Sequence, residues 1–358
     1  MKIGILTQPL HTNYGGLLQA FALQKYLRNM GHEALTVDYS RKPRAWLFPY
    51  RLARRCVAKF ILRRKIALFS KSLSPSAGKN TQRFVEENIR TTKKIWAPAR
   101  EGDFSEYGFD AFVVGSDQTW RPAYSPYMPT FFLDCLGEDK KIRRIAYASS
   151  FGKDEWEFTP EMTKVCAPLA KKFHAISVRE DSGVELCRKY LGVSAEHVID
   201  PTMLLSKEEY CEIVTRDEER GFLEKRSSGS HLFAYVLDEE PEKKSLIADV
   251  ATRLGLSVEE IMPKREALQS GKASYPPVSA WLRGFRDAEF VVTDSFHGCV
   301  FSIIFNKPFI AIGNAGRGMS RFHSLLKMFG LGNRLVLLKE GDEDLEGRIL
   351  SLVAKKID

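Results

Sequence analysis

The sequence predicts an α/β protein made of two Rossmann-like parallel-sheet domains that face one another across a cleft. The chain has 358 residues, 44% of them hydrophobic, and is too long for one ordinary core. Short buried-strand patterns alternate with helical patterns in both halves, which is typical of parallel sheets. The alternation is interrupted once, by a charged stretch that ends in the linker-like RSSGS.

We therefore divide the chain into four parts. An N-terminal α/β domain is expected over residues 1–205, a linker region over 206–229, a C-terminal α/β domain over 230–340 and a closing helix over 341–358. A basic amphipathic insertion over about residues 41–85 interrupts the first domain. Both domains are long enough to bury cores of their own.

Short apolar runs mark the strands, and segments of helical periodicity follow them. In the N-terminal domain the strand patterns cover residues 2–7, 34–39, 109–115, 143–149 and 174–179, and a helical pattern over 17–31 ends at Gly31. In the C-terminal domain strand patterns at 231–237, 256–262, 288–293, 308–313 and 334–338 alternate with helical ones at 244–254, 299–305 and 320–329, before a last helix at 343–354.

The net charge of +9 comes from one segment. Thirteen lysines and arginines, and no acidic residue, lie between Tyr39 and Val85, which leaves −4 for the rest of the chain. Residues 51–71 mix these charges with apolar residues, as in a basic helix on an anionic membrane surface. A solvated helix packed on its own domain is the alternative. The membrane-facing candidates are Arg51, Arg54, Arg55, Lys59, Arg63 and Arg64.

Several other classes of protein are not expected. The basic segment has no accompanying nucleic-acid-binding motif. No run of 18 apolar residues is present, the N-terminus is a strand pattern rather than a secretory signal, and the six cysteines lack metal-ligand spacing. We expect a cytoplasmic protein without a metal or cofactor, which the basic segment is able to hold at the inner face of the cytoplasmic membrane.

A histidine stands at the kind of place where ligands of parallel sheets bind. Such ligands lie beyond the carboxyl ends of strands, near helix N-termini with partial positive charge. His297 lies between the strand pattern AEFVVT and the next helix. An imidazole there is able to donate or accept a proton. A helix cap or a core hydrogen bond is the alternative role.

Two polar turns follow strands of the N-terminal domain. The turn NYGG lets a backbone approach a ligand closely, or serves only as a tight turn capped by Asn13; it is neither GxGxxG nor a P-loop. The turn GSDQTW places a polar trio beside Trp120, which suits a sugar. A cap formed by Asp117 and interdomain packing of Trp120 are the alternatives.

Three arginines occupy similar positions. Arg179 stands at a strand end and is able to bind a carboxylate or phosphate as a fork, or to pair only with Glu180 or Asp181. Arg317 and Arg321 flank glycines before a helix, which makes an anion site or a solvated loop.

Six motifs occur in an order that resembles the polysaccharide pyruvyl transferase family, from Ile3 to about Leu331. They are NYGGLLQAFAL, VVGSDQTW, SVREDSG, VIDPTMLL, TDSFHGCVFSIIFNKPFIAIG and RGMSRFHSLL. The resemblance implies a GT-B-like glycosyltransferase architecture. It also implies transfer of the enolpyruvyl unit of phosphoenolpyruvate onto a sugar as a ketal, in bacterial capsule or cell-envelope polysaccharide biosynthesis.

The resemblance also implies roles for individual residues. Arg179 matches the family arginine for phosphoenolpyruvate, and His297 matches the family histidine held essential. Many members have Arg-Leu-His where this chain has Ser295-Phe296-His297, so we expect other arginines to replace that charge. The phosphoenolpyruvate-binding candidates are Arg179 in the N-terminal domain and, in the C-terminal domain, Ser295, His297, Gly298, Arg317, Ser320 and Arg321. The acceptor-binding candidates, in the N-terminal domain, are Asn13, Tyr14, Gly15, Gly16, Ser116, Gln118 and Trp120.

The expected mechanism uses two catalytic residues. Protonated His297 donates to the methylene carbon of phosphoenolpyruvate, and Asp117 orients or deprotonates an acceptor hydroxyl. The acceptor is a saccharide, linked to a polyprenyl diphosphate if the basic segment faces a membrane. A GT-B glycosyltransferase that uses a nucleotide sugar and a catalytically silent saccharide-binding protein are the alternatives.

Overall fold

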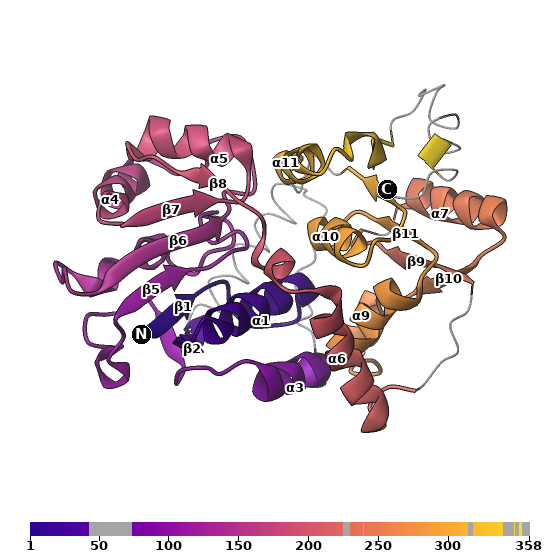
Figure 1. Ribbon diagram of the computed structural model, residues 1–358, viewed down its shortest axis with the longest axis horizontal. Coiled ribbons are helices and arrows are strands. Elements are labelled where there is room, and N and C mark those ends of the chain that lie inside the picture. Colours follow the sequence, from indigo (N-terminus) through magenta and orange to yellow (C-terminus); the bar gives the residue numbers. More distant parts are fainter. Residues whose placement is uncertain are drawn as a thin grey trace, which may run out of the picture.

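The computed structural model describes residues 1–42, 74–224, 230–238, 240–313, 318–338, 347 and 351–352. The membrane-facing candidates Arg51, Arg54, Arg55, Lys59, Arg63 and Arg64 lie outside these residues, as do Arg317 and most of the predicted closing helix. Within them the chain forms two lobes, each built on its own parallel sheet (Figure 1). The predicted fold class is confirmed.

The first lobe contains a six-stranded parallel sheet in the order β2-β1-β5-β6-β7-β8. Its strands are β1 (Lys2–Leu6), β2 (Glu33–Thr36), β5 (Ala111–Val114), β6 (Arg143–Ser149), β7 (Ala175–Val178) and β8 (Glu196–His197). A separate parallel pair joins β3 (Tyr39–Arg41) to β4 (Ile95–Ala97). The helices are α1 (Tyr14–Asn29), α3 (Lys79–Asn88), α4 (Pro160–Ala170) and α5 (Asp181–Leu186).

The second lobe contains a five-stranded parallel sheet in the order β10-β9-β11-β12-β13. Its strands are β9 (His231–Tyr235), β10 (Ser257–Glu260), β11 (Phe290–Thr293), β12 (Phe309–Ile312) and β13 (Leu335–Val336). Its helices are α7 (Pro241–Leu254), α8 (Arg265–Ser270), α9 (Val278–Asp287), α10 (Phe296–Ile304) and α11 (Ser320–Met328).

Capping residues explain why two helices begin earlier than periodicity predicts. Helix α1 begins at Tyr14 because the Asn13 side chain accepts a hydrogen bond from the Gly16 backbone N–H. Helix α10 begins at Phe296 because Ser295 accepts from the Gly298 N–H in the same way. The first turns contain glycines and a histidine instead of a run of apolar residues, so both predicted starts were three residues late.

The stretch expected as a linker, residues 206–229, contains helix α6 (Lys207–Glu219). Ser206 caps this helix in a capping box with Glu209, which explains why a highly charged segment is helical. Residues 225–229 are outside the described part of the chain.

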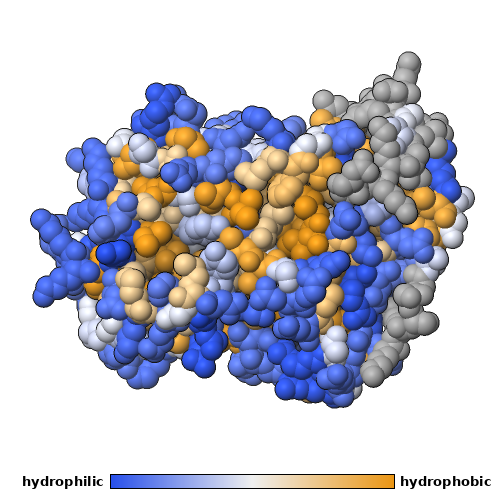
Figure 2. Space-filling model, viewed as in Figure 1, coloured by the Kyte–Doolittle hydropathy of each residue, from blue (hydrophilic) through white to orange (hydrophobic). Residues whose placement is uncertain are grey.

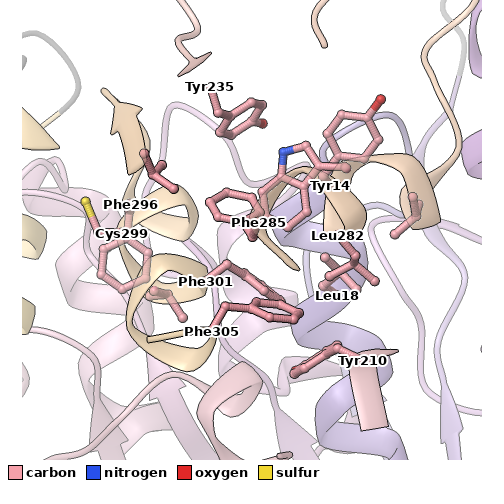
Figure 3. Packing of buried hydrophobic residues seen from close by; sticks show 14 of the residues in the cluster. Tyr14, Leu18, Tyr210, Tyr235, Leu282, Phe285, Phe296, Cys299, Phe301 and Phe305 are labelled. Atoms are coloured by element: carbon pink, nitrogen blue, oxygen red, sulfur yellow. The ribbon is translucent and has the colours of Figure 1, made fainter. Parts of the chain in front are cut away.

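The two lobes share one hydrophobic core. Aromatic side chains of α1 in the first lobe pack against those of α9 and α10 in the second (Figure 3). The ring of Tyr14 stacks on Trp281, with centroids 5.7 Å apart, and its hydroxyl donates to the Pro276 carbonyl at 2.9 Å. On the face of the molecule shown in Figure 2, apolar side chains gather between the lobes, while hydrophilic ones surround them.

The strand orders place a topological switch point in each sheet. In the first sheet the chain runs one way from β1 to β2 and the other way from β1 to β5; in the second, β9 lies between β10 and β11 in the same manner. Loops that leave the carboxyl ends of such neighbours diverge and leave a crevice for a ligand. The loops after β1, β5, β9 and β11 are therefore where a site is expected.

The shared core predicts that Trp281 holds the lobes together. Replacing Trp281, which is fully buried, with alanine should lower the free energy of unfolding by about 3–5 kcal/mol, because the aromatic cluster loses its central ring. Trp96→Ala is the matched control: this tryptophan is 41% exposed and its loss should change stability by less than about 0.5 kcal/mol. Urea unfolding followed by circular dichroism measures both, and equal losses would contradict the shared core.

Candidate functional site

A cleft between the lobes is lined by loops from both switch points. Its volume is about 270 Å³. The residues that line it are Thr12, Asn13, Tyr14, Asp117, Gln118, Tyr124, Tyr235, Leu237, Met262, Tyr275, Asp294, Ser295, Phe296, His297 and Arg321. They follow β1 and β5 in the first lobe and β9 and β11 in the second, apart from Met262, Tyr275 and Arg321.

His297 lies at the start of α10 and borders this cleft, with 6% of its surface exposed. Its ring rests on Gly15 of α1, so closely that a Cβ at position 15 would lie 2.0 Å from the ring Nδ1. The ring Nε2 lies 3.8 Å from the Asp200 carboxylate and has no hydrogen-bond partner in the described part of the chain. Burial lowers the pKa of His297, and the carboxylates of Asp200 and Asp117 only partly oppose this effect. The imidazole is therefore neutral near pH 7 in the ligand-free cleft.

Asp200, just after β8, is the residue that organises the site, and sequence reasoning did not identify it. Its buried carboxylate accepts hydrogen bonds from Arg179 Nη1 at 2.8 Å and Ser116 Oγ at 2.9 Å, and from the Thr202 N–H and hydroxyl at 3.0 and 2.8 Å. Burial alone would raise its pKa, but the charge that His297 carries when protonated, the charge of Arg179 and these hydrogen bonds bring the pKa below its ordinary value. Asp200 is therefore a carboxylate that faces the histidine.

Arg179 is buried and is paired on several sides. Besides Asp200, its Nη2 lies 3.5 Å from an Asp117 oxygen and its Nε lies 3.9 Å from Glu180. Its guanidinium carbon lies 4.3 Å from the centroid of the Phe296 ring. Arg179 Nε and Nη2 make no hydrogen bond within the described residues, so the guanidinium keeps donors for a further anion.

Glu180 lies beside Arg179, and its pKa shifts in the opposite direction to that of Asp200. Burial raises the pKa of Glu180, while Arg179 and a hydrogen bond from the Ser150 hydroxyl oppose the rise. Its other carboxylate oxygen has no hydrogen-bond partner among the described residues.

Arg321 approaches the same place from the second lobe. It stands in the first turn of α11, lines the cleft and has its guanidinium carbon 5.9 Å from the Phe296 ring centroid. Burial, and then the nearby charge of Arg179, lower its pKa to about 10, so it still carries a positive charge near pH 7. Two guanidinium groups therefore lie close to Phe296, one from each lobe.

Asp117 adopts an uncommon backbone conformation with φ of 63°. This left-handed region is disfavoured for side chains other than glycine, asparagine and aspartate, and such strain occurs often at functional sites. The conformation directs the Asp117 carboxylate toward Arg179 and the N-terminus of α1, where it lines the cleft. Asp117 thus lies within the same cleft as His297, as predicted.

Asp294 fixes the loop that leads from β11 into α10, where His297 lies. Its buried carboxylate accepts hydrogen bonds from the Leu237 and Asp238 backbone N–H groups at 2.8 and 3.3 Å, and from Lys243 Nζ at 2.9 Å. These contacts join the loop after β11 to the loop after β9. The two C-terminal loops of the cleft are therefore held as one unit.

The structure brings several predicted site residues together. Asn13, Tyr14, Gln118, Ser295 and Arg321 line the cleft with Asp117 and His297, and Arg179 lies directly behind them. Gly15 and Gly16 lie in the first turn of α1, with Gly15 occupied by the histidine ring. Gly298 packs on Thr293, and Ser320 is buried at the start of α11.

Two predicted acceptor-binding residues were wrong. Trp120 is fully buried within the first lobe, where its Nε1 donates to the Phe131 carbonyl at 3.0 Å and its ring stacks on Phe132. It is therefore core rather than a sugar platform or an interdomain contact. Ser116 is also fully buried, because its hydroxyl donates to Asp200. It supports the site from behind and is out of reach of a sugar.

Two broader features concern metals and membranes. Among the described residues, no group of three or more histidine, cysteine, aspartate or glutamate side chains converges to hold a metal ion. No helix in the described part of the chain combines the length and apolar character needed to cross a membrane.

Comparison with known proteins gives a family match and a fold match. Residues 13–316 match the family described as polysaccharide pyruvyl transferase. No curated protein matches the sequence. The UDP-GlcNAc 2-epimerase from Methanocaldococcus jannaschii is similar in structure, with a TM-score of 0.56 and 12% identity over 100% of this chain and 94% of that one. The UDP-GlcNAc 2-epimerase from Neisseria meningitidis, bound to UDP-GlcNAc, has a TM-score of 0.50 and 10% identity over 98% and 90% of the two chains. These similarities show the GT-B-like fold.

The contact between Gly15 and His297 predicts a sharp difference between two neighbouring glycines. Gly15→Ala should displace the ring and lower the free energy of unfolding by about 1–3 kcal/mol, because its Cβ would lie 2.0 Å from Nδ1. A Cβ at Gly16 would meet its nearest atoms at 3.4 to 3.5 Å, so Gly16→Ala should be neutral or slightly stabilising within the helix. Thermal unfolding of both variants tests this, and equal stability would contradict the close packing of the ring.

The lowered pKa of His297 predicts acid sensitivity. In the unfolded chain this histidine has its ordinary pKa of 6.5, while in the folded chain it binds a proton only at lower pH. Protons therefore bind preferentially to the unfolded chain, and the free energy of unfolding decreases as pH falls below about 6.5. The slope that His297 adds should not exceed about 1.4 kcal/mol per pH unit. Urea unfolding between about pH 7.5 and 5.5 should show a shallower slope for His297→Gln than for the wild type. His323→Gln, which removes an exposed histidine from α11, should keep the wild-type slope.

Proposed function

The chain belongs to the polysaccharide pyruvyl transferase family, and we propose that it transfers the enolpyruvyl unit of phosphoenolpyruvate onto a sugar to form a pyruvate ketal. The observation that carries this proposal is that His297 and Arg321 line one interlobe cleft and that Arg179 lies directly behind it, with both guanidinium groups close to Phe296. Phosphoenolpyruvate has a carboxylate and a phosphate, and two guanidinium groups with a nearby proton donor are the partners that such a compound requires.

Arg321 is the residue we propose as the replacement for the arginine that many family members have at position 295. In this chain Ser295 caps α10, and both guanidinium groups lie near the ring of Phe296. Arg321 comes from α11, and its guanidinium carbon lies 5.9 Å from the centroid of that ring. Its burial strengthens its interaction with an anion, because little water remains to screen the charge.

The donor itself would set the protonation state that the reaction needs. His297 is neutral in the ligand-free cleft because burial lowers its pKa. The phosphate and carboxylate of a bound donor add negative charge near the ring. This charge favours the protonated imidazolium and so raises the pKa of the histidine. The proton that the imidazole gains is then available for transfer, and Asp200 stabilises the imidazolium.

The proposed steps balance as follows. His297 transfers its proton to the methylene carbon, which becomes a methyl group, and the central carbon gains the character of an oxocarbenium ion. A sugar hydroxyl forms a bond to this carbon and gives its proton to Asp117. The carbon–oxygen bond to phosphate then breaks, and a second hydroxyl closes the ketal while its proton leaves with phosphate. Arg179 and Arg321 stabilise the charge that develops on the departing phosphate.

The proposal includes a saccharide as the acceptor. The expected polyprenyl-diphosphate link and the anionic membrane surface depend on residues 43–73, which are outside the described part of the chain, so the proposal does not rest on them.

Replacement of His297 tests the proposal. In His297→Gln, turnover should fall by about 10²–10⁴-fold, because the group that supplies the proton is lost while the arginines still bind phosphoenolpyruvate. Release of inorganic phosphate from phosphoenolpyruvate measures the rate. Mass spectrometry of a panel of oligosaccharides identifies the product by the gain of one pyruvate less one water. His323→Gln, an exposed histidine on α11, is the control and should keep wild-type turnover.

The same assay separates the alternatives. Nucleotide release from a nucleotide sugar, without phosphate release from phosphoenolpyruvate, would establish a glycosyltransferase instead. Saccharide binding without turnover of either donor would establish a silent binding protein. Full turnover by His297→Gln would refute the role of the histidine.

A further inference from the structure

A second cavity lies in the first lobe and adjoins the interlobe cleft. Its volume is about 360 Å³, within the range of small-molecule sites. Its lining comes from the loop before α1, the β3 region, α3 and the segment before β4, and includes His11, Asp38, Thr81, Gln82, Glu86 and Lys94. Thr12 lines both this cavity and the interlobe cleft. A molecule in the cavity is therefore adjacent to a molecule in the cleft.

Two pairs of polar side chains lie on the lining of this cavity. Lys94 Nζ lies 3.6 Å from the Asp38 carboxylate, and on α3 Gln82 Nε2 donates to Glu86 at 2.9 Å. Each pair keeps further hydrogen-bonding atoms for a ligand. The Thr81 hydroxyl, beside them, donates to the Gly78 carbonyl at 2.9 Å.

The composition of the lining favours a neutral polyhydroxylated ring over an anion. Two carboxylates, Asp38 and Glu86, face a single lysine and a histidine whose pKa is lowered by burial and by that lysine. Hydroxyls of Thr12, Ser40, Thr81 and Thr91 and the amide of Gln82 add neutral hydrogen-bonding groups. Leu10 and Val85 supply an apolar wall of the kind that the less polar face of a sugar ring contacts.

We propose that this cavity, which we name the first-lobe pocket, binds a hexose ring of the saccharide acceptor. This inference rests on the proposed pyruvyl transfer and extends it by assigning the acceptor a place. The loop from His11 to Asn13 separates the pocket from the cleft, and the next turn packs on His297. A ring in the pocket would direct a hydroxyl past Thr12 toward the donor.

Gly78 offers a way to fill the pocket without straining the backbone. Its φ of −93° suits any residue, and a Cβ there would meet Thr12 Cγ2 at 3.4 Å and Thr81 Oγ1 at 3.6 Å, both on the pocket wall. Gly78→Leu therefore places a side chain where the sugar would bind. Gly332→Leu is the matched control, because a Cβ at Gly332, in the second lobe, would meet no atom within 4 Å.

The test uses saturation-transfer NMR with methyl β-D-glucopyranoside, methyl β-D-galactopyranoside and methyl β-D-mannopyranoside, each with phosphoenolpyruvate present. At least one glycoside should bind the wild type and the Gly332→Leu variant and lose its signal in Gly78→Leu. Gln82→Ala should weaken binding about threefold to tenfold through the loss of one hydrogen bond, and it decides the matter if Gly78→Leu does not fold. The phosphorus NMR signal of phosphoenolpyruvate reports donor binding in the same samples.

Each outcome has a distinct meaning. Loss of the glycoside signal with donor binding intact supports the pocket. An unchanged glycoside signal in the folded Gly78→Leu variant and in Gln82→Ala, or no signal with the wild type, overturns it. A wild type that binds a glycoside in this pocket but neither binds nor turns over phosphoenolpyruvate leaves the pocket as a sugar site and refutes pyruvyl transfer, so the two failures are distinguishable.

Discussion

The buried carboxylate of Asp200 is the charge on which the arrangement of the cleft depends. A lone ion in the interior would cost several kcal/mol, so it persists only because Arg179 and three hydrogen-bonding groups surround it. The same carboxylate faces His297 across the boundary between the lobes. One residue of the first lobe thereby fixes an arginine behind the cleft and sets the electrostatic environment of a histidine from the second.

The cleft and the first-lobe pocket differ in the charge of the groups that surround them. Arg179 and Arg321 have few exposed atoms, and their interactions with an anion are weakly screened. Burial raises the pKa of Glu180, which lies beside Arg179. The first-lobe pocket differs because its carboxylates outnumber its lysine. If both proposals hold, a charged donor and a neutral acceptor would be directed to neighbouring but different places.

Sequence reasoning succeeded where a simple topological rule applied. Asp117 and His297 stand just beyond strand ends and line the cleft, with Arg179 directly behind it, because parallel strands present their carboxyl ends together. It failed for Trp120, because a tryptophan that follows a polar turn is expected to be exposed, whereas this one packs into the core of the first lobe. Asp200 was missed because Asp-Pro also begins a turn, and only the fold shows that Arg179 points at it.

The shared core also has a consequence for how the protein is made. Helix α1 is synthesised early, but much of the surface that covers Tyr14 and Leu18 belongs to α9 and α10, near the end of the chain. The first lobe cannot bury this apolar stripe while it emerges from the ribosome. Burial of these side chains must therefore wait until the second lobe has been synthesised. Until then the exposed apolar surface favours aggregation, which chaperones counteract.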